Sequence, residues 1–422
     1  MARVVVCFVR HRGRVLLARG GETAGTDPDR WDGISGRIDD ASGAPEADGR
    51  RVLRDAVGTA AAGFEFVRDG QPLDGGDESG AVAVVPVLFE SDTGDVAVGG
   101  AFDAVEWVDP TRIRARKTAP WLRTAWRRVA PTVATVRADR IHGSAWIAAR
   151  ALETLRDAAA AADAWDDVVG VARDLRAARP EMAAVANGVD RAVATAGSPP
   201  IDPDALVDCA IDVRDEVLAA GDDAARAAAD HLRGIDATAV ATLSRSGTVR
   251  AALAALSPDR LVVAESRPER EGVGVAEWAA AETDATVTLT TEAGLPTALA
   301  RDDIDAVLVG ADAIAPGGNV VNKTGTRLLA LAARDADVPV YVAASTFKIR
   351  PAGGDEAGTA SEQLSPAEAV YDGDVDLSVH APTFEAVAAE LVDGVATEDG
   401  LLDTDAVRAV ADAHADNAAW TG

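Results

Sequence analysis

The sequence predicts an α/β protein in three parts, a mixed α/β unit over residues 1–130, a helical segment over 131–235 and a parallel sheet over 236–422. The first part alternates short apolar runs with turn signals. The second is rich in alanine, with apolar residues at helical spacing. The third repeats an apolar run, a turn and a helical pattern, which is typical of a parallel sheet. The length of 422 residues suits two or three domains.

The first part contains strand, turn and helix patterns in turn. Two apolar runs on either side of His11-Arg12-Gly13 predict a hairpin. A proline inside a third apolar run, Pro86, suggests an edge strand or a bulge, because proline cannot donate a ladder hydrogen bond. The expected strands are Arg3–Val9, Val15–Ala18, Ala81–Phe89 and Val105–Val108, and the expected helices are Glu46–Ala62 and Pro120–Val129.

Helices fill the middle part, and strands alternate with helices in the last. Amphipathic runs predict helices over 145–162, 165–176, 181–195 and 203–232. From Ala237 onward come the apolar runs TAVATL, RLVVAE, ATVTLTT, DAVLVGAD and VPVYVAAS. Continuous apolar strands between helices indicate a sheet covered on both faces. Ligands of such sheets bind at the carboxyl ends of the strands, so we expect a site there.

Composition excludes several classes of protein. The net charge is −28, from 69 acidic residues against 41 lysines and arginines, so we do not expect direct nucleic-acid binding. Two cysteines exclude a disulfide scaffold and a multi-cysteine metal cluster. Arginine interrupts the apolar N-terminus, and no apolar stretch is long enough to cross a membrane, so we expect a cytoplasmic protein. The excess of aspartate and the scarcity of lysine indicate adaptation to high salt.

The strand ends of the last part carry residues suited to a phosphorylated small molecule. They are Ser244, Ser246, Gly247 and Thr248 after the first run, Arg267 after the second, Asp312 after the fourth, Asn322 and Lys323 in the turn that follows, and Lys348 after the last. Ser246-Gly247-Thr248 and Gly325-Thr326 stand where helices begin, and free N–H groups at such positions attract anions. The chain has only three lysines, and two of them fall at these strand ends. An ammonium group binds phosphate as a compact point charge.

The segment VVNKTGT (residues 320–326), preceded by VLVGADAI and followed by VYVAASTFK, resembles the translation initiation factor 2B alpha/beta/delta family. That family includes methylthioribose-1-phosphate and ribose-1,5-bisphosphate isomerases, and the resemblance covers residues 131–422. It implies a helical subdomain, a Rossmann-like subdomain, dimers or higher homo-oligomers, and a sugar-phosphate pocket between the two subdomains.

The resemblance also implies roles for individual residues. Asn322, Lys323 and Lys348 would hold phosphate and hydroxyl groups, and Asp312 matches the isomerases' catalytic aspartate. Ser244 stands where the isomerases have a catalytic cysteine, and a hydroxyl is a much poorer acid than a thiol. In the helical part, the phosphate-binding positions would be Arg179 and the turn His142-Gly143-Ser144, where histidine replaces the family's arginine.

Residues 1–130 resemble a degenerate Nudix domain, through Val15–Arg19, Trp31–Gly36, the helix from Gly49 and the late strand AVEWVDP. The family's metal-binding helix ends Arg-Glu-x-x-Glu-Glu-x-Gly, whereas residues 51–58 read Arg-Val-Leu-Arg-Asp-Ala-Val-Gly. Only Asp55 is left as a metal ligand, although Asp39 and Asp40 could compensate. Because Mg²⁺ needs several oxygen ligands, we expect Mg²⁺ as a cofactor only if this domain is active.

Three functions follow from these resemblances. The leading one is a regulatory protein that binds a phosphorylated sugar or nucleotide. The first alternative is a sugar-1-phosphate aldose–ketose isomerase that uses Asp312, and the second is a Nudix hydrolase with a regulatory C-terminal domain.

Overall fold

A computed structural model describes residues 2–20, 30–38, 44–75, 82–96, 102–301, 303–354 and 363–422. The chain forms two compact units, the first from residues 1–135 and 153–162, and the second from residues 136–152 and 163–422. One helix, α4 (Ser144–Ala159), therefore has its first half in the second unit and its second half in the first. The division expected at residues 130 and 235 stays a proposal. Residues 153–162, which lie within the expected helical part, belong to the first unit.

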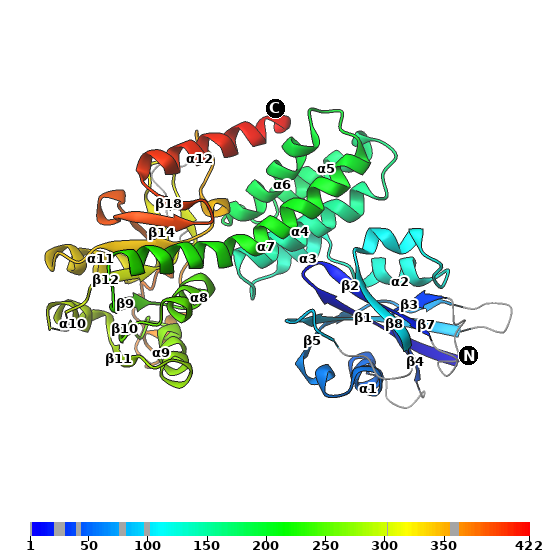
Figure 1. The fold of residues 1–422 in the computed structure, drawn as a ribbon, viewed down its shortest axis with the longest axis horizontal. Helices are drawn as coiled ribbons and strands as arrows, with labels where there is room; N and C mark the ends of the chain where they lie inside the picture. Colours follow the sequence, from blue (N-terminus) through cyan, green and yellow to red (C-terminus); the bar gives the residue numbers. More distant parts are fainter. Residues whose placement is uncertain are drawn as a thin grey trace. The chain divides into compact units, whose positions relative to one another are not determined.

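The first unit is a mixed sheet with a helix on each face (Figure 1). Helix α1 (Pro45–Val57) packs on one face through Val52 and Leu53, and α2 (Leu122–Val129) packs on the other through Leu122 and Trp126. The strands are β1 (Ala2–His11), β2 (Arg14–Gly20), β3 (Trp31–Asp32), β4 (Ile34–Ile38), β5 (Phe64–Asp69), β6 (Leu73–Asp74), β7 (Val82–Ser91) and β8 (Phe102–Val108). The antiparallel pair β1–β2 confirms the expected hairpin.

Of the two alternatives expected for Pro86, the edge strand is wrong, whereas the β5–β7 ladder does shift its register close by, between Phe66 and Arg68. Strand β7 lies inside the sheet, with β1 on one side and β5 and β6 on the other. The Pro86 carbonyl accepts a hydrogen bond from Gly70 N at 2.9 Å, just after β5 ends. A strand residue presents its N and O atoms on the same side. The missing N–H therefore faces the gap between β5 and β6, where the ladder needs no donor.

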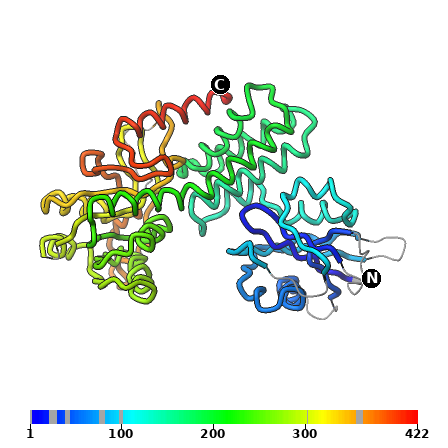
Figure 2. Tube along the Cα trace, viewed as in Figure 1, coloured from blue at the N-terminus to red at the C-terminus, as the bar shows by residue number. Residues whose placement is uncertain are grey.

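The second unit begins with the expected helical segment. It contains α3 (Val133–Ala138, which the unit boundary divides), the first half of α4, α5 (Trp165–Arg176), α6 (Ala183–Ala196) and the long helix α7 (Pro203–Gly234). Breaks at Pro180 and Gly197 separate them, as predicted. The C-terminal helix α12 (Thr404–Asn417) returns to pack on α6 (Figure 2). Beyond it, Trp420 Nε1 donates to the buried Asp190 of α6 at 3.0 Å.

The parallel sheet of the second unit confirms the expected α/β fold. Its order is β11-β10-β9-β12-β15-β17-β18, and only the last pair is antiparallel. The elements are β9 (Ala239–Leu243), α8 (Gly247–Leu256), β10 (Arg260–Ala264), α9 (Glu271–Glu282), β11 (Thr286–Thr290), α10 (Leu295–Arg301), β12 (Ala306–Val309), α11 (Thr326–Asp335), β15 (Val340–Ala343), β17 (Gly394–Thr397) and β18 (Gly400–Leu402). A small antiparallel sheet joins β13 (Ala313–Ile314), β14 (Val320–Lys323) and β16 (Phe384–Val387). This architecture places the carboxyl ends of the six parallel strands β11, β10, β9, β12, β15 and β17 along one edge.

Candidate functional site

The strand order positions the site. Strands β9, β10 and β11 run outward in one direction, and β12, β15 and β17 in the other, so the order reverses between β9 and β12. Ligands of open α/β sheets bind at such a reversal, outside the carboxyl ends of the strands. Ser244 directly follows β9, and Asp312 follows β12 by three residues. The catalytic positions implied by resemblance therefore lie on both sides of this reversal.

Part of the Asp312 side chain is exposed to solvent, while protein groups around its carboxyl group displace much of the water there. Its backbone N–H donates to Val321 O at 2.8 Å, which fixes the turn after β12. Loss of hydration raises the pKa of its carboxyl group, Lys348 and Lys323 act to lower it, and Glu271 acts to raise it. Asp312 thus keeps a proton to a higher pH than an ordinary aspartate, which suits a group that transfers protons.

Lys348 lies beside Asp312. Its ammonium donates to Ala311 O at 2.6 Å, one residue before the aspartate. Burial lowers the pKa of Lys348, and the charge of Asp312 opposes this effect. The two side chains therefore influence each other through their charges, and the hydrogen bond of the Lys348 ammonium is the one to the Ala311 carbonyl.

Lys323 is engaged by two carboxylates that sequence reasoning missed. Its side chain is 3% exposed, and its ammonium donates to Glu269 at 3.0 Å and to Glu271 at 2.7 Å. Its hydrogen bond is also the main cause that lowers the pKa of Glu269. A phosphate at Lys323 would have to displace or share these partners. The sequence did offer a signal for these partners, because Glu269 and Glu271 closely follow Arg267 at the end of the same strand.

The start of α11 is not the open anion site expected from Gly325-Thr326. Glu385 accepts hydrogen bonds from Gly325 N at 2.6 Å and from Arg327 N at 2.9 Å, so a carboxylate of the chain itself occupies this helix terminus. The pairing of β14 with β16, which sets Glu385 opposite Asn322, brings it there. Asn322 is buried, and its amide donates to Thr326 Oγ1 at 3.0 Å.

The start of α8 is open. Ser246 Oγ caps the helix by accepting from Val249 N at 3.3 Å, while Gly247 is exposed and Thr248 is half-buried. Gly310, at the end of β12, lies so close that a Cβ atom there would be 2.8 Å from Ser246 Oγ. The turn after β9 therefore packs directly against the end of β12.

Ser244 and Arg267 are the last two of the predicted residues at the strand ends. We call the whole set the strand-end group: Ser244, Ser246, Gly247, Thr248, Arg267, Asp312, Asn322, Lys323 and Lys348. The backbone N–H of Ser244 donates to Ser266 Oγ at 2.6 Å, and Ser244 itself has a left-handed φ of 63°. Arg267 is exposed, and its guanidinium reaches Ala369 O at 3.5 Å. This contact ties Arg267 to a neighbouring loop.

The helical part brings its own predicted residues together around Asp139. His142 contacts the Asp139 carboxylate at 2.8 Å, and Arg179, which is 4% exposed, donates to Asp139 O and, at 2.6 Å, to Glu181. Burial acts to raise the pKa of Asp139, but hydrogen bonds from His142 and Ile141 produce a net lowering. The following Gly143 is exposed, and Ser144 begins α4. Among the described residues, no hydrogen bond or ion pair joins His142 or Arg179 to the strand-end group.

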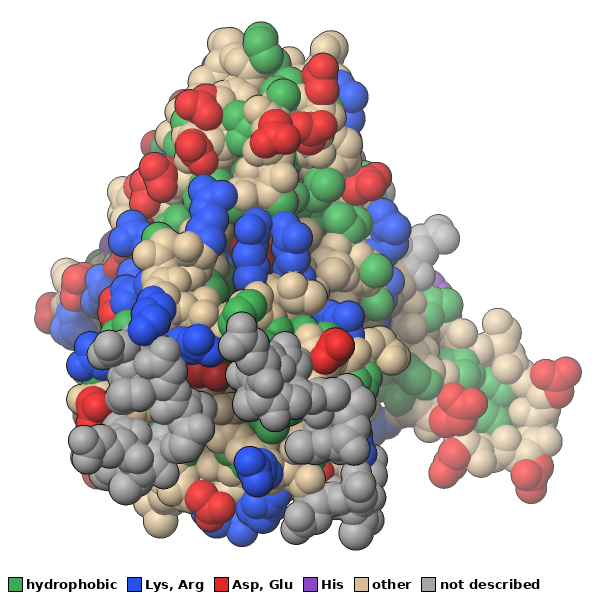
Figure 3. All heavy atoms as spheres, turned by 90° about the vertical axis from the view of Figure 1, so that its right-hand side faces the viewer, with side chains coloured by type: hydrophobic (Ala, Val, Ile, Leu, Met, Phe, Trp, Pro, Cys, Tyr) green, Lys and Arg blue, Asp and Glu red, His purple; other side chains and the backbone are tan. Residues whose placement is uncertain are grey.

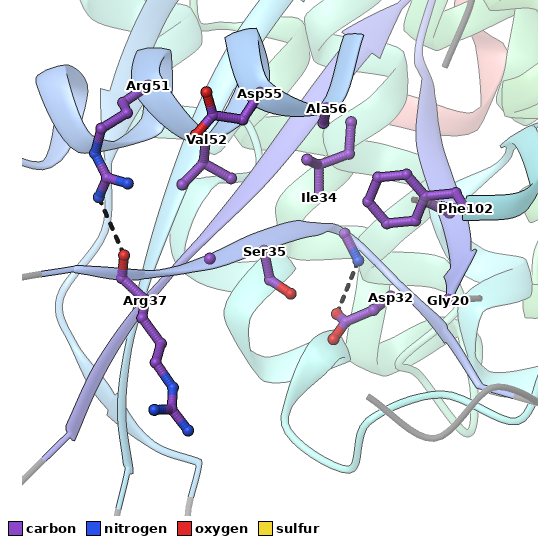
Figure 4. A pocket seen from close by; sticks show the side chains of 13 residues that line it. Gly20, Asp32, Ile34, Ser35, Arg37, Arg51, Val52, Asp55, Ala56 and Phe102 are labelled. Carbon is purple, nitrogen blue, oxygen red and sulfur yellow. Dashed lines mark hydrogen bonds between the residues drawn. The ribbon is translucent and has the colours of Figure 1, made fainter. Parts of the chain in front are cut away.

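Asp55 lines a separate cavity of about 210 Å³ in the first unit (Figure 4). Arg51 and Asp55 reach it from α1, and Phe102 lies at its other end. Sequence reasoning missed Asp32. Burial raises the pKa of its carboxyl group to about 7, although the hydrogen bond from Gly33 N and the charge of Arg30 act to lower it. Within the described ranges, no cluster of three or more histidine, cysteine or acidic side chains could hold a metal. The described residues therefore do not fit catalytic Mg²⁺, while Asp39 and Asp40 lie outside them.

Residues 140–404 match the Initiation factor 2 subunit family, and the chain belongs to that family. It is 33% identical over 161 residues to a methylthioribose-1-phosphate isomerase of Acaryochloris marina, which covers 37% of this chain and 45% of that protein. It is 33% identical over 186 residues to a 5-deoxyribose 1-phosphate isomerase of Moorella thermoacetica, which covers 40% and 52%. The chain thus spans about half the length of these curated relatives.

Solved structures show the same fold. The translation initiation factor eIF-2B of Pyrococcus horikoshii OT3 aligns with a TM-score of 0.51 and 25% identity, over 64% of this chain and 94% of that one. The tetrameric eIF2B-beta2-delta2 complex of C. thermophilum aligns with a TM-score of 0.51 and 18% identity, over 67% and 92%. In the part of the chain that the structure describes, no helix combines the length and apolarity that crossing a bilayer requires.

Proposed function

We propose that the strand-end group of the second unit is the active site of a sugar-1-phosphate aldose–ketose isomerase. The observation that carries the proposal is Asp312, whose pKa is raised beside Lys348 at the reversal of the strand order. The curated relatives named above are isomerases of this kind, so they favour this alternative over the regulatory function that we first expected.

The reaction moves a hydrogen between two adjacent carbons of the sugar, so it needs groups that take up and release protons. A carboxyl group that keeps its proton to a raised pH can donate it and take it back. Lys348 would balance negative charge that develops on the substrate oxygen, and the open N–H groups at the start of α8 would bind the phosphate. Ser244 would contribute a hydroxyl where the family's isomerases use a thiol.

The test is ketose formation from methylthioribose 1-phosphate, 5-deoxyribose 1-phosphate and ribose 1,5-bisphosphate. We expect turnover by the wild type, a loss of at least about a hundredfold in Asp312→Asn, and a gain in Ser244→Cys. Asp335→Asn, which neutralises an exposed aspartate at the end of α11, is the matched control. Absence of turnover in both the wild type and Ser244→Cys would contradict the proposal.

Regulatory binding is the second candidate, and the observation that favours it is Ser244 itself. A serine in place of the thiol would leave a pocket that binds without reaction. Calorimetry with AMP and pentose phosphates separates the two functions, because a regulator would bind without forming ketose. In either case we expect a homo-oligomer, which light scattering on the full chain would measure.

A further inference from the structure

One stretch of the sequence, most of it in the first unit, has a charge opposite to that of the whole chain. Between Asp109 and Asp139 the sequence has no acidic residue and eight arginines and lysines, although the chain carries 69 acidic residues and a net charge of −28. The stretch includes Lys117, the one lysine of the three outside the strand-end group. The negative net charge therefore does not describe this part of the surface.

Three arginines of this stretch converge, and we call them the arginine cluster. Arg114 belongs to the short helix η2 (Pro110–Ala115), and Arg123 and Arg127 belong to α2, one turn apart on the same face. All three are exposed and line a cavity of about 30 Å³ together with Trp126. Figure 3 shows arginine and lysine side chains gathered on the face of the molecule that it presents.

The cluster is under electrostatic repulsion. Loss of hydration lowers the pKa of Arg123, and the charges of Arg127 and Arg114 lower it further. Asp157 lines the same cavity and opposes this effect. Its carboxylate, however, already accepts hydrogen bonds from Arg156 at 2.8 Å and Trp126 at 3.1 Å. Arg114 Nη1 donates to a neutral group, Ala160 O, at 3.3 Å, and Asp157 is the one acidic side chain among the residues lining this cavity, against three guanidinium groups.

We propose that the arginine cluster binds the phosphodiester backbone of a nucleic acid. Guanidinium groups bind phosphate oxygens through two parallel hydrogen bonds, and arginines on successive helical turns present a row of such donors. A phosphodiester chain offers closely and regularly spaced anions, whereas carboxylates on a protein surface are interspersed with other groups. At physiological salt the screening length is about 8 Å, so distant acidic residues weaken this contact little.

The test uses the full chain and fluorescence anisotropy with a labelled 20-nucleotide RNA, the same sequence as duplex DNA, and poly-glutamate. The salt range is one in which circular dichroism shows the chain folded. We expect saturable binding to RNA, DNA or both, and at least about tenfold weaker binding by Arg123→Gln/Arg127→Gln. The slope of log affinity against log salt should fall by about 1.5, since two phosphate contacts are lost.

Arg226→Gln/Arg233→Gln removes two exposed arginines from α7 with the same loss of charge and should bind as the wild type does. Arg114→Gln is a second test within the cluster, should the double variant unfold. Comparison of RNA with DNA identifies the source of the phosphodiester. The proposal is overturned by absence of nucleic-acid binding, by equal binding of poly-glutamate, or by unchanged affinity in the cluster variants. A change in oligomeric mass without a change in nucleic-acid affinity would point to a protein partner instead and would also overturn it.

Discussion

Asn187 of α6 holds the turn that carries Lys348. Its side-chain amide donates to Phe347 O at 2.9 Å and to Ile349 O at 2.7 Å, the carbonyl groups on both sides of the lysine. Asn187 is 1% exposed, so these hydrogen bonds are shielded from water. The helical part of the second unit therefore determines where one of the two strand-end lysines lies.

Replacing Asn187 with alanine should disturb both stability and binding. Two buried carbonyl groups would lose their donor, at a cost of about 2 kcal/mol, and the Lys348 turn would lose its support. We expect a lower melting temperature and, in calorimetry, weaker binding of a sugar 1-phosphate. Asn417→Ala, at the end of α12, is the control. An affinity of Asn187→Ala equal to that of the wild type would contradict the claim that the Lys348 turn contributes to binding.

Asp32 should make the first unit less stable as the pH rises. Its pKa is raised from 3.8 to about 7, so folding disfavours the ionised form, and stability falls between about pH 4 and pH 7. Asp32→Asn removes this loss. Because the side chain is partly accessible, we expect a gain of about 2 kcal/mol at pH 8 and almost none at pH 4.

Thermal melts at several pH values measure this effect. Asp55→Asn, which replaces an exposed aspartate of the same cavity, should keep the wild-type pH dependence. Equal melting temperatures of Asp32→Asn and the wild type at pH 8 would refute the prediction.

Arg156 should be essential to the first unit. It is fully buried in the second half of α4 and donates to Gly13 O at 3.1 Å, Asp109 at 3.0 Å and Asp157 at 2.8 Å. Arg156→Met would leave these acceptors without their cation, at a cost of about 3 kcal/mol. Urea unfolding measures the loss, and the exposed Arg173→Met should change little. A midpoint equal to that of the wild type would show that the network does not stabilise the unit.

Stability should rise with salt. A dense acidic surface repels itself in dilute buffer, and molar salt shortens the screening length to about 3 Å. We expect the melting temperature to increase between 0.1 M and 2 M potassium chloride, because the chain carries 69 acidic residues against 41 basic ones. The same melting temperature at both concentrations would exclude adaptation to salt.

The parts of the fold that could be predicted are those set by local pattern. Continuous apolar runs between helices identified the parallel sheet, and the strand-end rule brought Asp312 and Lys348 together. Pairings between distant segments could not be read in this way. Glu385 reaches the start of α11 through a strand pairing that bridges some sixty residues, so the occupied helix terminus had no local signal.

The same limit applies to the first unit. Nothing near Arg156 in the sequence identifies Asp109 or Gly13 as its partners, because they come from elements more than forty residues away. The position of Pro86 inside the sheet depends likewise on where β5 ends and β6 begins.

Because α4 contributes one half to each unit, the units share a folding element as well as a chain. Unwinding the helix around Leu152 and Glu153, where the two halves meet, would remove structure from both. Destabilising α4 at this junction should therefore lower the melting temperatures of both units in calorimetry. An insertion of residues into this helix would disturb the packing of both units, whereas an insertion into a surface loop would disturb that of one unit.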